Sequence, residues 1–350
     1  MTRPHHVTQG PFAPPAPVRE LEVASADGVE LYVQVHGPEG GPAVVLAHGW
    51  TCSTAFWAPI VRSLVAEGHR VVVYDQRGHG LTTAGLEGRP TGYSPATLAD
   101  DLCAVLDATL EPGEQAVIGG HSMGGMTIMA AAGRAQLQEH AAALMLCSTG
   151  ARSLPGTSSV IPMPGARARE LAHRATLGAG APFGPITPLS KALIRYVTMG
   201  AGVGPEARDA AVRIVHSAPR RPRAAWGRVL SGLDLHAKLR DLDVPTAVVH
   251  GTHDRLTPFA HAVHLAENLP HLTELHKLSG LGHMTPMEAP EAVAGVLRKL
   301  AAAHLTAPAA PADTSATEPS STKPSSTKPS STKPPGGASA GGASVSEEAA

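Results

Sequence analysis

One serine stands in a sequence setting that suits nucleophilic attack. The run Val117-Ile118-Gly119-Gly120-His121-Ser122-Met123-Gly124-Gly125-Met126 places Ser122 between glycines two positions before and two positions after it. This Gly-x-Ser-x-Gly spacing is typical of a tight strand-to-helix turn that holds a strained serine and exposes its hydroxyl. The helix that follows would direct its first N–H groups at the reaction centre. The pattern predicts a nucleophile elbow, although an ordinary glycine-rich turn can share the spacing.

Two further polar residues follow apolar runs of strand length. Asp254 comes just after Thr246–His250, and His283 lies in the loop after Thr273–Leu278. Open parallel sheets build their sites at the carboxyl ends of the strands, so we expect both side chains near Ser122. The chain order serine, aspartate, histidine is the order in which nucleophile-elbow enzymes carry their triad. The spacing therefore predicts three distant loops that meet at one point.

Strand-like and helix-like segments alternate along most of the chain, which predicts an α/β protein with a mostly parallel, doubly wound sheet. Short continuous apolar runs are expected for strands that helices cover on both faces. The predicted strands are Leu21–Val23, Leu31–His36, Ala43–Ala47, Arg70–Tyr74, Gln115–Ile118, Ala142–Cys147, Thr246–His250 and Thr273–Leu278. The predicted helices are 54–67, 94–110, one from the elbow to Gln138, 257–268 and 286–305.

The alternation stops between residues 148 and 233, a stretch rich in Gly, Pro and Arg that we interpret as an inserted helical cap. Between Ala151 and Leu233, eleven Arg and one Lys stand against three acidic residues, a net charge of +9. Such a charge run is usually a solvated face. It can also steer anionic substrates or rest on an acidic surface. Helical pieces are predicted at Ala166–Leu177, Leu189–Met199 and Glu206–His216.

The two ends of the chain differ from the rest. Residues 1–18 are rich in Pro and predict a flexible arm. Residues 306–350 contain three copies of Ser-Ser-Thr-Lys-Pro and predict a disordered tail, whose partner, if it has one, the sequence does not identify. The expected core therefore comprises residues 19–147 and 234–305, on either side of the cap.

Composition excludes several classes of function. The net charge of −1 over 350 residues gives no global basic field for nucleic acid. The three cysteines show no CxxC spacing, HExxH is absent, and neither a disulfide framework nor a metal site is expected. No apolar run reaches transmembrane length, and the start lacks the apolar stretch of a secretory signal, so we expect a cytoplasmic protein without an integral membrane segment.

These motifs together resemble the α/β-hydrolase fold family, in its cap-bearing branch of serine esterases and cofactor-free haloperoxidase-like enzymes. The resemblance covers roughly residues 21–305 and implies the α/β-hydrolase fold. The matching pieces are His48-Gly49-Trp50, Asp75-Gln76-Arg77-Gly78-His79-Gly80, Gly120-His121-Ser122-Met123-Gly124-Gly125, Gly251-Thr252-His253-Asp254-Arg255-Leu256-Thr257-Pro258 and Gly282-His283-Met284.

The resemblance implies a catalytic triad. Ser122 would be the nucleophile, His283 the general base, and Asp254 the residue that orients and stabilises the imidazolium. The backbone N–H groups of Trp50 and Met123 would form the oxyanion hole. The implied activity is hydrolysis of a carboxylic ester, or a related acyl bond, of a small to medium apolar substrate, without cofactor or metal. The 75–80 loop resembles a structural loop of the family and is assigned no chemistry.

Other activities remain open at this stage. The serine argues against epoxide hydrolases and haloalkane dehalogenases of the family, which use aspartate at the elbow. A cofactor-free perhydrolase, a thioesterase or a C–C bond hydrolase would use the same three residues, and a hydrolase-derived small-molecule receptor could retain them. His253 is a weaker choice than its neighbour Asp254 because adjacent side chains diverge. Residues that could line a pocket or simply pack in the core are Cys52, Met123, Met126, Met284 and Trp226.

Overall fold

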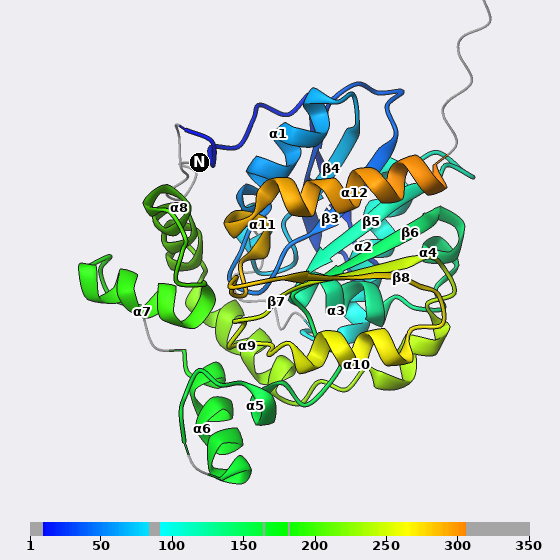
Figure 1. The fold of residues 1–350 in the computed structure, drawn as a ribbon. Helices are drawn as coiled ribbons and strands as arrows, with labels where there is room; N and C mark the ends of the chain where they lie inside the picture. The colour runs from blue at the N-terminus through cyan, green and yellow to red at the C-terminus, as the bar shows by residue number, and fades with distance from the viewer. Residues whose placement is uncertain (1–9, 84–91, 164, 181–182, 306–350) are drawn as a thin grey trace, which may run out of the picture. The chain divides into compact units, whose positions relative to one another are not determined.

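A single eight-stranded sheet forms the centre of the structure, a computed structural model that describes residues 10–83, 92–163, 165–180 and 183–305. The strands are β1 (Arg19–Ala24), β2 (Glu30–His36), β3 (Ala43–Ala47), β4 (Arg70–Tyr74), β5 (Ala116–His121), β6 (Ala141–Cys147), β7 (Thr246–Gly251) and β8 (Leu272–Leu278). Their order across the sheet is β1-β2-β4-β3-β5-β6-β7-β8 (Figure 1). β1 pairs antiparallel with β2 and β2 antiparallel with β4, whereas the other pairs are parallel. The predicted α/β class with a mostly parallel sheet is confirmed.

Alternate residues of the central strands pack against two different layers of helices. In β3, Val44 and Leu46 belong to one buried cluster, and Val45 and Ala47 belong to the other. This alternation follows from the two-residue period of a strand and explains why its sequence is apolar throughout. The first cluster includes α1 (Ala58–Ala66) and α12 (Pro290–His304). The second includes α2 (Pro95–Thr109), α3 (Met123–Ala130) and α10 (Ala260–Asn268).

Two predicted helices are interrupted. The helix expected from the elbow to Gln138 consists of α3 and α4 (Ala135–His140), separated by a turn in which Gly133 has φ +80°. The helix expected over 286–305 consists of α11 (Thr285–Glu288) and α12, because the residue before Pro290 is disfavoured in helical conformation. Short 3₁₀ helices, which the sequence analysis did not separate, are η1 (Thr54–Trp57), η2 (Gly80–Thr83) and η3 (His236–Asp241).

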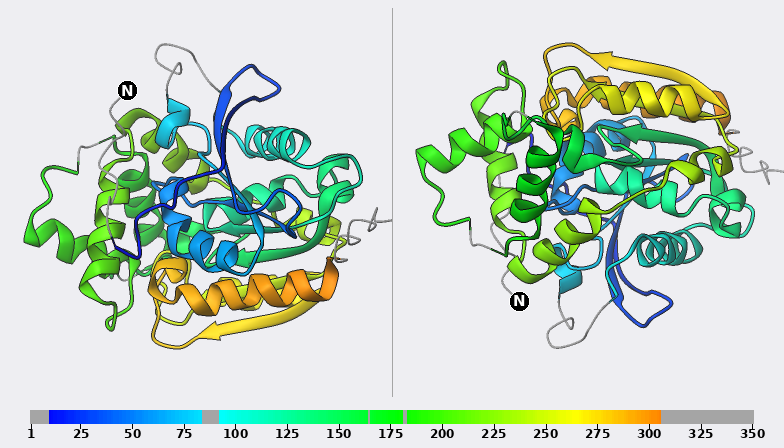
Figure 2. Two further views of the ribbon diagram at one scale, coloured as in Figure 1. Left: turned by 90° about the horizontal axis from the view of Figure 1, so that it is seen from above. Right: turned by 90° about the horizontal axis from the view of Figure 1, so that it is seen from below.

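The insertion, residues 148–233, lies between β6 and β7 and is helical. Its helices are α5 (Leu154–Thr157), α6 (Ala166–Gly178), α7 (Pro188–Thr198), α8 (Pro205–His216) and α9 (Arg220–Ser231). They collect on one side of the sheet, as the green helices of Figures 1 and 2 show. A β-bridge between Arg152 and Asp234 joins the two ends of the insertion. The sequence analysis did not predict α9. Its arginine-rich sequence hides the pattern of buried residues, such as Trp226.

Two tryptophans fasten α9 to the loops that follow β3 and β4. The indole Nε1–H of Trp50, after β3, donates to the carbonyl oxygen of Arg223 at 3.1 Å. The indole of Trp226, in α9, donates to the carbonyl oxygen of Arg77, after β4, at 2.9 Å. Each indole has one N–H donor. The Trp50 donor binds the backbone of α9, and the Trp226 donor binds the backbone of the loop after β4. α9 is therefore held at both loops that border the site.

The chain ends are described only in part. Residues 1–9 of the predicted arm and 306–350, the predicted tail, lie outside the described residues. In residues 10–18, Ala13 is buried, and its carbonyl oxygen accepts hydrogen bonds from the Arg62 guanidinium of α1 at 2.7 and 3.1 Å. No helix among the described residues is long and apolar enough to cross a membrane.

Candidate active site

Ser122 occupies a strained turn between β5 and α3. Its backbone angles are φ 52° and ψ −114°, in a region that residues with side chains rarely adopt. A Cβ atom on Gly120 would lie 2.4 Å from the carbonyl of Gly124, and one on Gly124 would lie 2.0 Å from the carbonyl oxygen of Ala47. Both glycines are thus required by close backbone approach, which is the physical content of the sequence pattern.

The structure brings Asp254 and His283 together. The Nδ1 atom of His283 lies 2.8 Å from Oδ2 of Asp254, and both residues are buried. Asp254 Oδ1 accepts the backbone N–H groups of Leu256 and Thr257 at 2.9 Å each. Oδ2 also accepts the hydroxyl of Thr257 at 2.8 Å, and His250 Nε2 lies 3.3 Å from it. The carboxylate is therefore almost fully hydrogen-bonded.

These contacts keep Asp254 ionised. Burial alone would favour the protonated acid, but the charges and hydrogen bonds of His283 and His250 outweigh it and hold the pKa of the carboxyl well below its usual range. A carboxylate at Nδ1 selects the imidazole tautomer whose Nε2 is free to accept a proton. Asp254 and His283 thus have the arrangement of an orienting carboxylate and a histidine base.

Ser122 and His283 line the same cavity, of about 300 Å³. Within the described part of the chain, no hydrogen bond joins the Ser122 hydroxyl to the His283 ring. Catalytic hydrogen bonds are often long in unliganded sites and shorten when substrate binds. The structure therefore places Ser122 and His283 on the wall of one cavity without a direct hydrogen bond between their side chains.

The cavity wall is largely apolar and comes from both the core and the insertion. Among the described residues that line it, none is Asp, Glu, Lys or Arg, so the described Lys and Arg residues of the insertion lie outside it. The lining residues are Trp50, Thr51, His121, Ser122, Met126, Leu154, Pro155, Ser158, Val160, His173, Thr176, Leu177, Phe183, Leu193, Ile194, Val197, Thr198, Val215, Leu230, Leu256, Thr257, His283 and Met284.

The two expected oxyanion donors come from the residue after Ser122 and from the end of the neighbouring strand. Met123 begins α3, and Trp50 follows β3, the strand beside β5. Neither backbone N–H donates to another residue within the described ranges. An unpaired N–H at a helix start is available to an anion. Both groups are thus free for the role that the resemblance implies.

The loop after β4, to which no chemistry was assigned, supports the segment after β3 that contains Trp50. Gln76 receives the hydroxyl of Thr127 from α3 at 2.6 Å, and its side-chain amide donates to the carbonyl oxygen of His48. The backbone N–H of Thr51 donates to Nε2 of His79 at 3.2 Å. The loop therefore ties the β3 segment to the elbow helix.

Three buried histidines around this segment are held neutral. Burial lowers the pKa of His79 to about 4 and that of His121 to about 3, and it holds the pKa of His48 well below its usual range. His121 occupies the variable position of the elbow motif and received no role from the sequence. Its Nε2 lies 2.9 Å from the carbonyl oxygen of His283, and its ring fills the space that a side chain at Gly49 would need.

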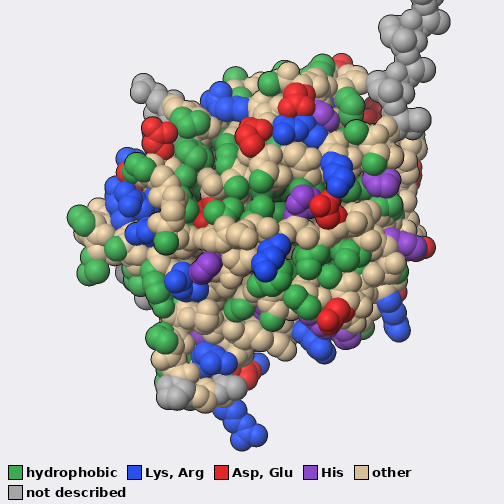
Figure 3. All heavy atoms as spheres, viewed as in Figure 1, with side chains coloured by type: hydrophobic (Ala, Val, Ile, Leu, Met, Phe, Trp, Pro, Cys, Tyr) green, Lys and Arg blue, Asp and Glu red, His purple; other side chains and the backbone are tan. Residues whose placement is uncertain are grey.

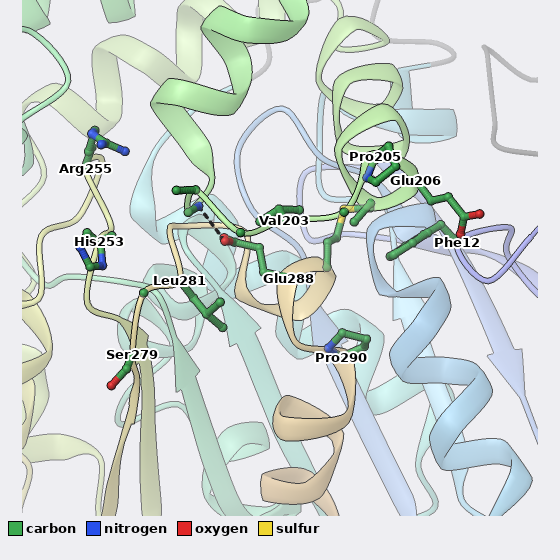
Figure 4. Close-up of a pocket in the computed structure, with 17 residues that line it drawn as sticks. Phe12, Val203, Pro205, Glu206, His253, Arg255, Ser279, Leu281, Glu288 and Pro290 are labelled. Carbon is green, nitrogen blue, oxygen red and sulfur yellow. Dashed lines mark hydrogen bonds between the residues drawn. The ribbon is translucent and has the colours of Figure 1, made fainter.

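Glu288 is a site residue that sequence reasoning missed. Its Oε2 accepts the backbone N–H of Gly282, beside His283, at 2.9 Å. It also accepts the N–H of Gly200, in the insertion, at 2.8 Å, the contact that Figure 4 draws as a dashed line. The carbonyl oxygen of Thr198 accepts the N–H of His283 at 2.8 Å. The loop that carries the histidine is thus bonded directly to the end of α7. The only sequence signal is an acidic residue five positions after His283.

The remaining candidates divide as follows. His253 is exposed and lies on a separate shallow pocket with Arg255 (Figure 4), away from the cavity of Ser122. Cys52 is a buried thiol whose pKa burial raises to about 12. Met126 and Met284 line the cavity, whereas Met123 and Trp226 are buried without lining it. Among the described residues, no group of three or more His, Cys, Asp or Glu could hold a metal ion.

Comparison with known proteins identifies the family of the fold. Residues 42–290 match the model of the alpha/beta hydrolase fold. The chain belongs to the α/β-hydrolase fold family.

Relatives within the α/β-hydrolase family differ in their named activities. The chain is 34% identical over 257 residues to a Variovorax paradoxus protein named "Putative carbamate hydrolase RutD", covering 72% of this chain and 89% of the relative. It is 28% identical over 273 residues to a non-heme chloroperoxidase of Streptomyces lividans, covering 75% and 92%. An esterase structure from Rhodococcus sp. ECU1013 is similar with a TM-score of 0.62 and 25% identity, covering 81% of this chain and 99% of that one.

The neutral histidines predict a loss of stability in acid. His79 and His121 bind protons with a pKa near 6.5 when unfolded but only near 4 and 3 when folded. The unfolded state therefore binds more protons below pH 6.5, and stability falls as the pH drops through that value towards 4. At pH 5 each of the two costs about 2 kcal/mol. Asp75, whose pKa burial raises to about 6, opposes the trend by less than one histidine does.

Thermal unfolding measured between pH 7.5 and pH 5 should therefore show a steadily falling Tm. His79→Asn should reduce the slope of Tm against pH, because it removes one of these groups. His271→Asn is the control, since His271 is exposed and pairs with Asp243 at 2.7 Å. Equal slopes in all three proteins would contradict this account.

The Glu288 contacts predict a positioning effect on the serine–histidine pair. Glu288→Ala removes the side-chain oxygen that accepts two backbone N–H groups and should slow labelling of Ser122 by a fluorophosphonate about tenfold or more. Glu288→Gln keeps an amide oxygen for the same two donors and should stay within about threefold of wild type. Mass spectrometry of the labelled serine gives the rates. Similar labelling by the Ala and Gln variants would show that these hydrogen bonds do not position His283.

Proposed function

We propose that this protein is a serine hydrolase that cleaves a carboxylic ester of a small to medium apolar substrate. One observation carries the proposal: the buried Asp254–His283 pair, joined at 2.8 Å, borders the cavity into which the strained Ser122 opens. Family membership supports a hydrolase, and the esterase and carbamate-hydrolase names of similar proteins support acyl chemistry at this site.

The proposed reaction begins with attack of Ser122 Oγ on the carbonyl carbon of the ester. His283 takes the hydroxyl proton at Nε2, while Asp254 stabilises the resulting imidazolium. The tetrahedral oxyanion accepts hydrogen bonds from the N–H groups of Met123 and Trp50, each worth about 3 kcal/mol of barrier. His283 then returns the proton to the leaving alcohol, and an acyl-serine remains. Water, activated by His283, releases the acid.

The cavity favours an uncharged acyl group. Its described lining is mostly aliphatic and aromatic and includes no Asp, Glu, Lys or Arg that could pair with a charged group on the substrate. Desolvation of such a charge would have no compensating interaction. We propose that the insertion acts as a cap that sets acyl size through residues such as Leu177, Leu193 and Val197. The basic surface of the insertion then has no part in substrate binding within the cavity.

Removal of the nucleophile is the decisive test. Ser122→Ala should lower the rate of p-nitrophenyl butyrate hydrolysis at least about 10⁴-fold, because the covalent step is lost. The Tm should stay within about 2 °C of wild type, since one hydroxyl is deleted from a cavity wall. Ser158→Ala, at another serine of the same cavity, is the matched control and should keep the rate within about threefold. Retained turnover in Ser122→Ala would place the nucleophile elsewhere.

Perhydrolysis is a second candidate, favoured by the similarity to a non-heme chloroperoxidase over 75% of the chain. In this reaction hydrogen peroxide replaces water at the acyl-serine, and a peracid forms. We expect Ser122→Ala to abolish both reactions, because they share the acyl intermediate. With acetate and hydrogen peroxide as substrates, peracetic acid can be followed by bromination of monochlorodimedone. A perhydrolase would show this turnover at a rate comparable to its ester hydrolysis, whereas an esterase would show only a minor rate.

A further inference from the structure

Exposed large apolar side chains gather on one part of the insertion. Nine such residues occur in the described part of the chain, and seven of them lie between positions 163 and 196. Soluble monomers rarely expose such a concentration without a use for it. The seven are Met163, Leu171, Phe183, Ile186, Leu189, Leu193 and Tyr196; the other two are Val18 and Val263.

The helix α7 presents apolar side chains on more than one face. Leu189, Leu193 and Tyr196 follow each other at spacings of four and three residues and share one side of the helix. Their exposed fractions are 80%, 59% and 43%. Ile194 and Val197 lie on the side that lines the cavity. The cavity therefore accounts for Ile194 and Val197, and in part for Leu193, whereas Leu189 extends into solvent on the helix that protrudes in Figure 1.

We call Ile186, Leu189, Leu193 and Tyr196 the α7 face. The sequence of residues 306–350 does not suit an apolar contact, because it contains a single large apolar side chain, Val345. A second copy of the chain is also a poor occupant. Each copy would bring an insertion with a net charge of +9 to the contact, and like charges repel at such short range.

The charge of the insertion that carries the α7 face favours an acidic partner. Lys191 and Arg195 are on α7 itself, and α6, elsewhere in the same insertion, carries Arg167, Arg169 and Arg174. Lys191 pairs with Asp209 at 2.9 Å and Arg174 with Glu170 at 2.9 Å, yet the segment retains its large basic surplus. Figure 3 shows hydrophobic side chains next to Lys and Arg side chains over α7, at the left of the view. Exposed aliphatic side chains among basic ones are the combination that binds anionic bilayers.

We propose that the α7 face docks the protein on an anionic lipid surface. Leu189 and its neighbours would enter the boundary between headgroups and acyl chains, while Lys and Arg contact the lipid phosphates. A protruding convex helix suits a deformable lipid layer better than a preformed protein groove. Leu193 is both exposed and part of the cavity wall, so docking would bring the cavity to the lipid. This last consequence, access of lipid-dissolved esters to Ser122, rests on the proposed function; the docking itself does not.

The test measures sedimentation of the full-length protein with sucrose-loaded vesicles. Vesicles of equal parts phosphatidylglycerol and phosphatidylcholine should bind the protein at least tenfold more strongly than vesicles of phosphatidylcholine alone. Leu189→Asp should lower the partition coefficient at least tenfold without changing the Tm, because that side chain is 80% exposed. Val263→Asp, at an exposed valine of α10, is the matched control and should bind like wild type. Ser122→Ala should also bind like wild type, which separates docking from catalysis.

Several results would overturn the proposal. Wild-type protein that stays in the supernatant with phosphatidylglycerol vesicles would do so, as would equal binding to both vesicle types. Equal binding by wild type and Leu189→Asp, or an equal loss in Val263→Asp, would show that the α7 face is not the contact. Sedimentation equilibrium provides the last arm: a wild-type dimer that Leu189→Asp converts to a monomer would identify the face as a self-association surface instead.

Discussion

The close approach of α3 to the end of β3 is the constraint on which the site depends. With Gly124 against the carbonyl oxygen of Ala47, the chain must turn within one residue, and Ser122 takes up a positive φ. The strain is held by neighbours on both sides: the Ser122 N–H donates to Cys147 at 2.9 Å, and its carbonyl oxygen accepts the hydroxyl of Thr149 at 2.7 Å. The sheet and the helix layers thus stabilise a backbone conformation that would be unfavourable alone.

Burial sets opposite charge states on two sides of this turn. Asp254 remains ionised because two histidines and a hydroxyl compensate its loss of water. His48, His79 and His121 lack such compensation and remain neutral. The negative charge of Asp254 therefore lies beside Nδ1 of His283, where, in the proposed mechanism, it favours an imidazolium.

Local patterns predicted the elements, and their order along the chain predicted the residues that meet. The apolar runs predicted both ends of β3 and β4 correctly, because strands covered on both faces are almost entirely apolar. Helix interruptions at Gly133 and Pro290 were missed although both residues are visible signals. Thr257, His250 and Glu288 were not predictable in their roles, since each acts through a contact that exists only after distant loops have come together.

The two indole hydrogen bonds distinguish α9 from the other helices of the insertion. α9 is hydrogen-bonded to the loops after β3 and β4, so a substitution in α9 would act directly on the loop that contains Trp50. α6 and most of α7 contribute cavity wall, and Thr198, at the end of α7, accepts the N–H of His283. Exchange of residues 165–195 is therefore a route by which related chains can diverge in substrate range while their chemistry is conserved. A combinatorial library would best be placed in the same segment.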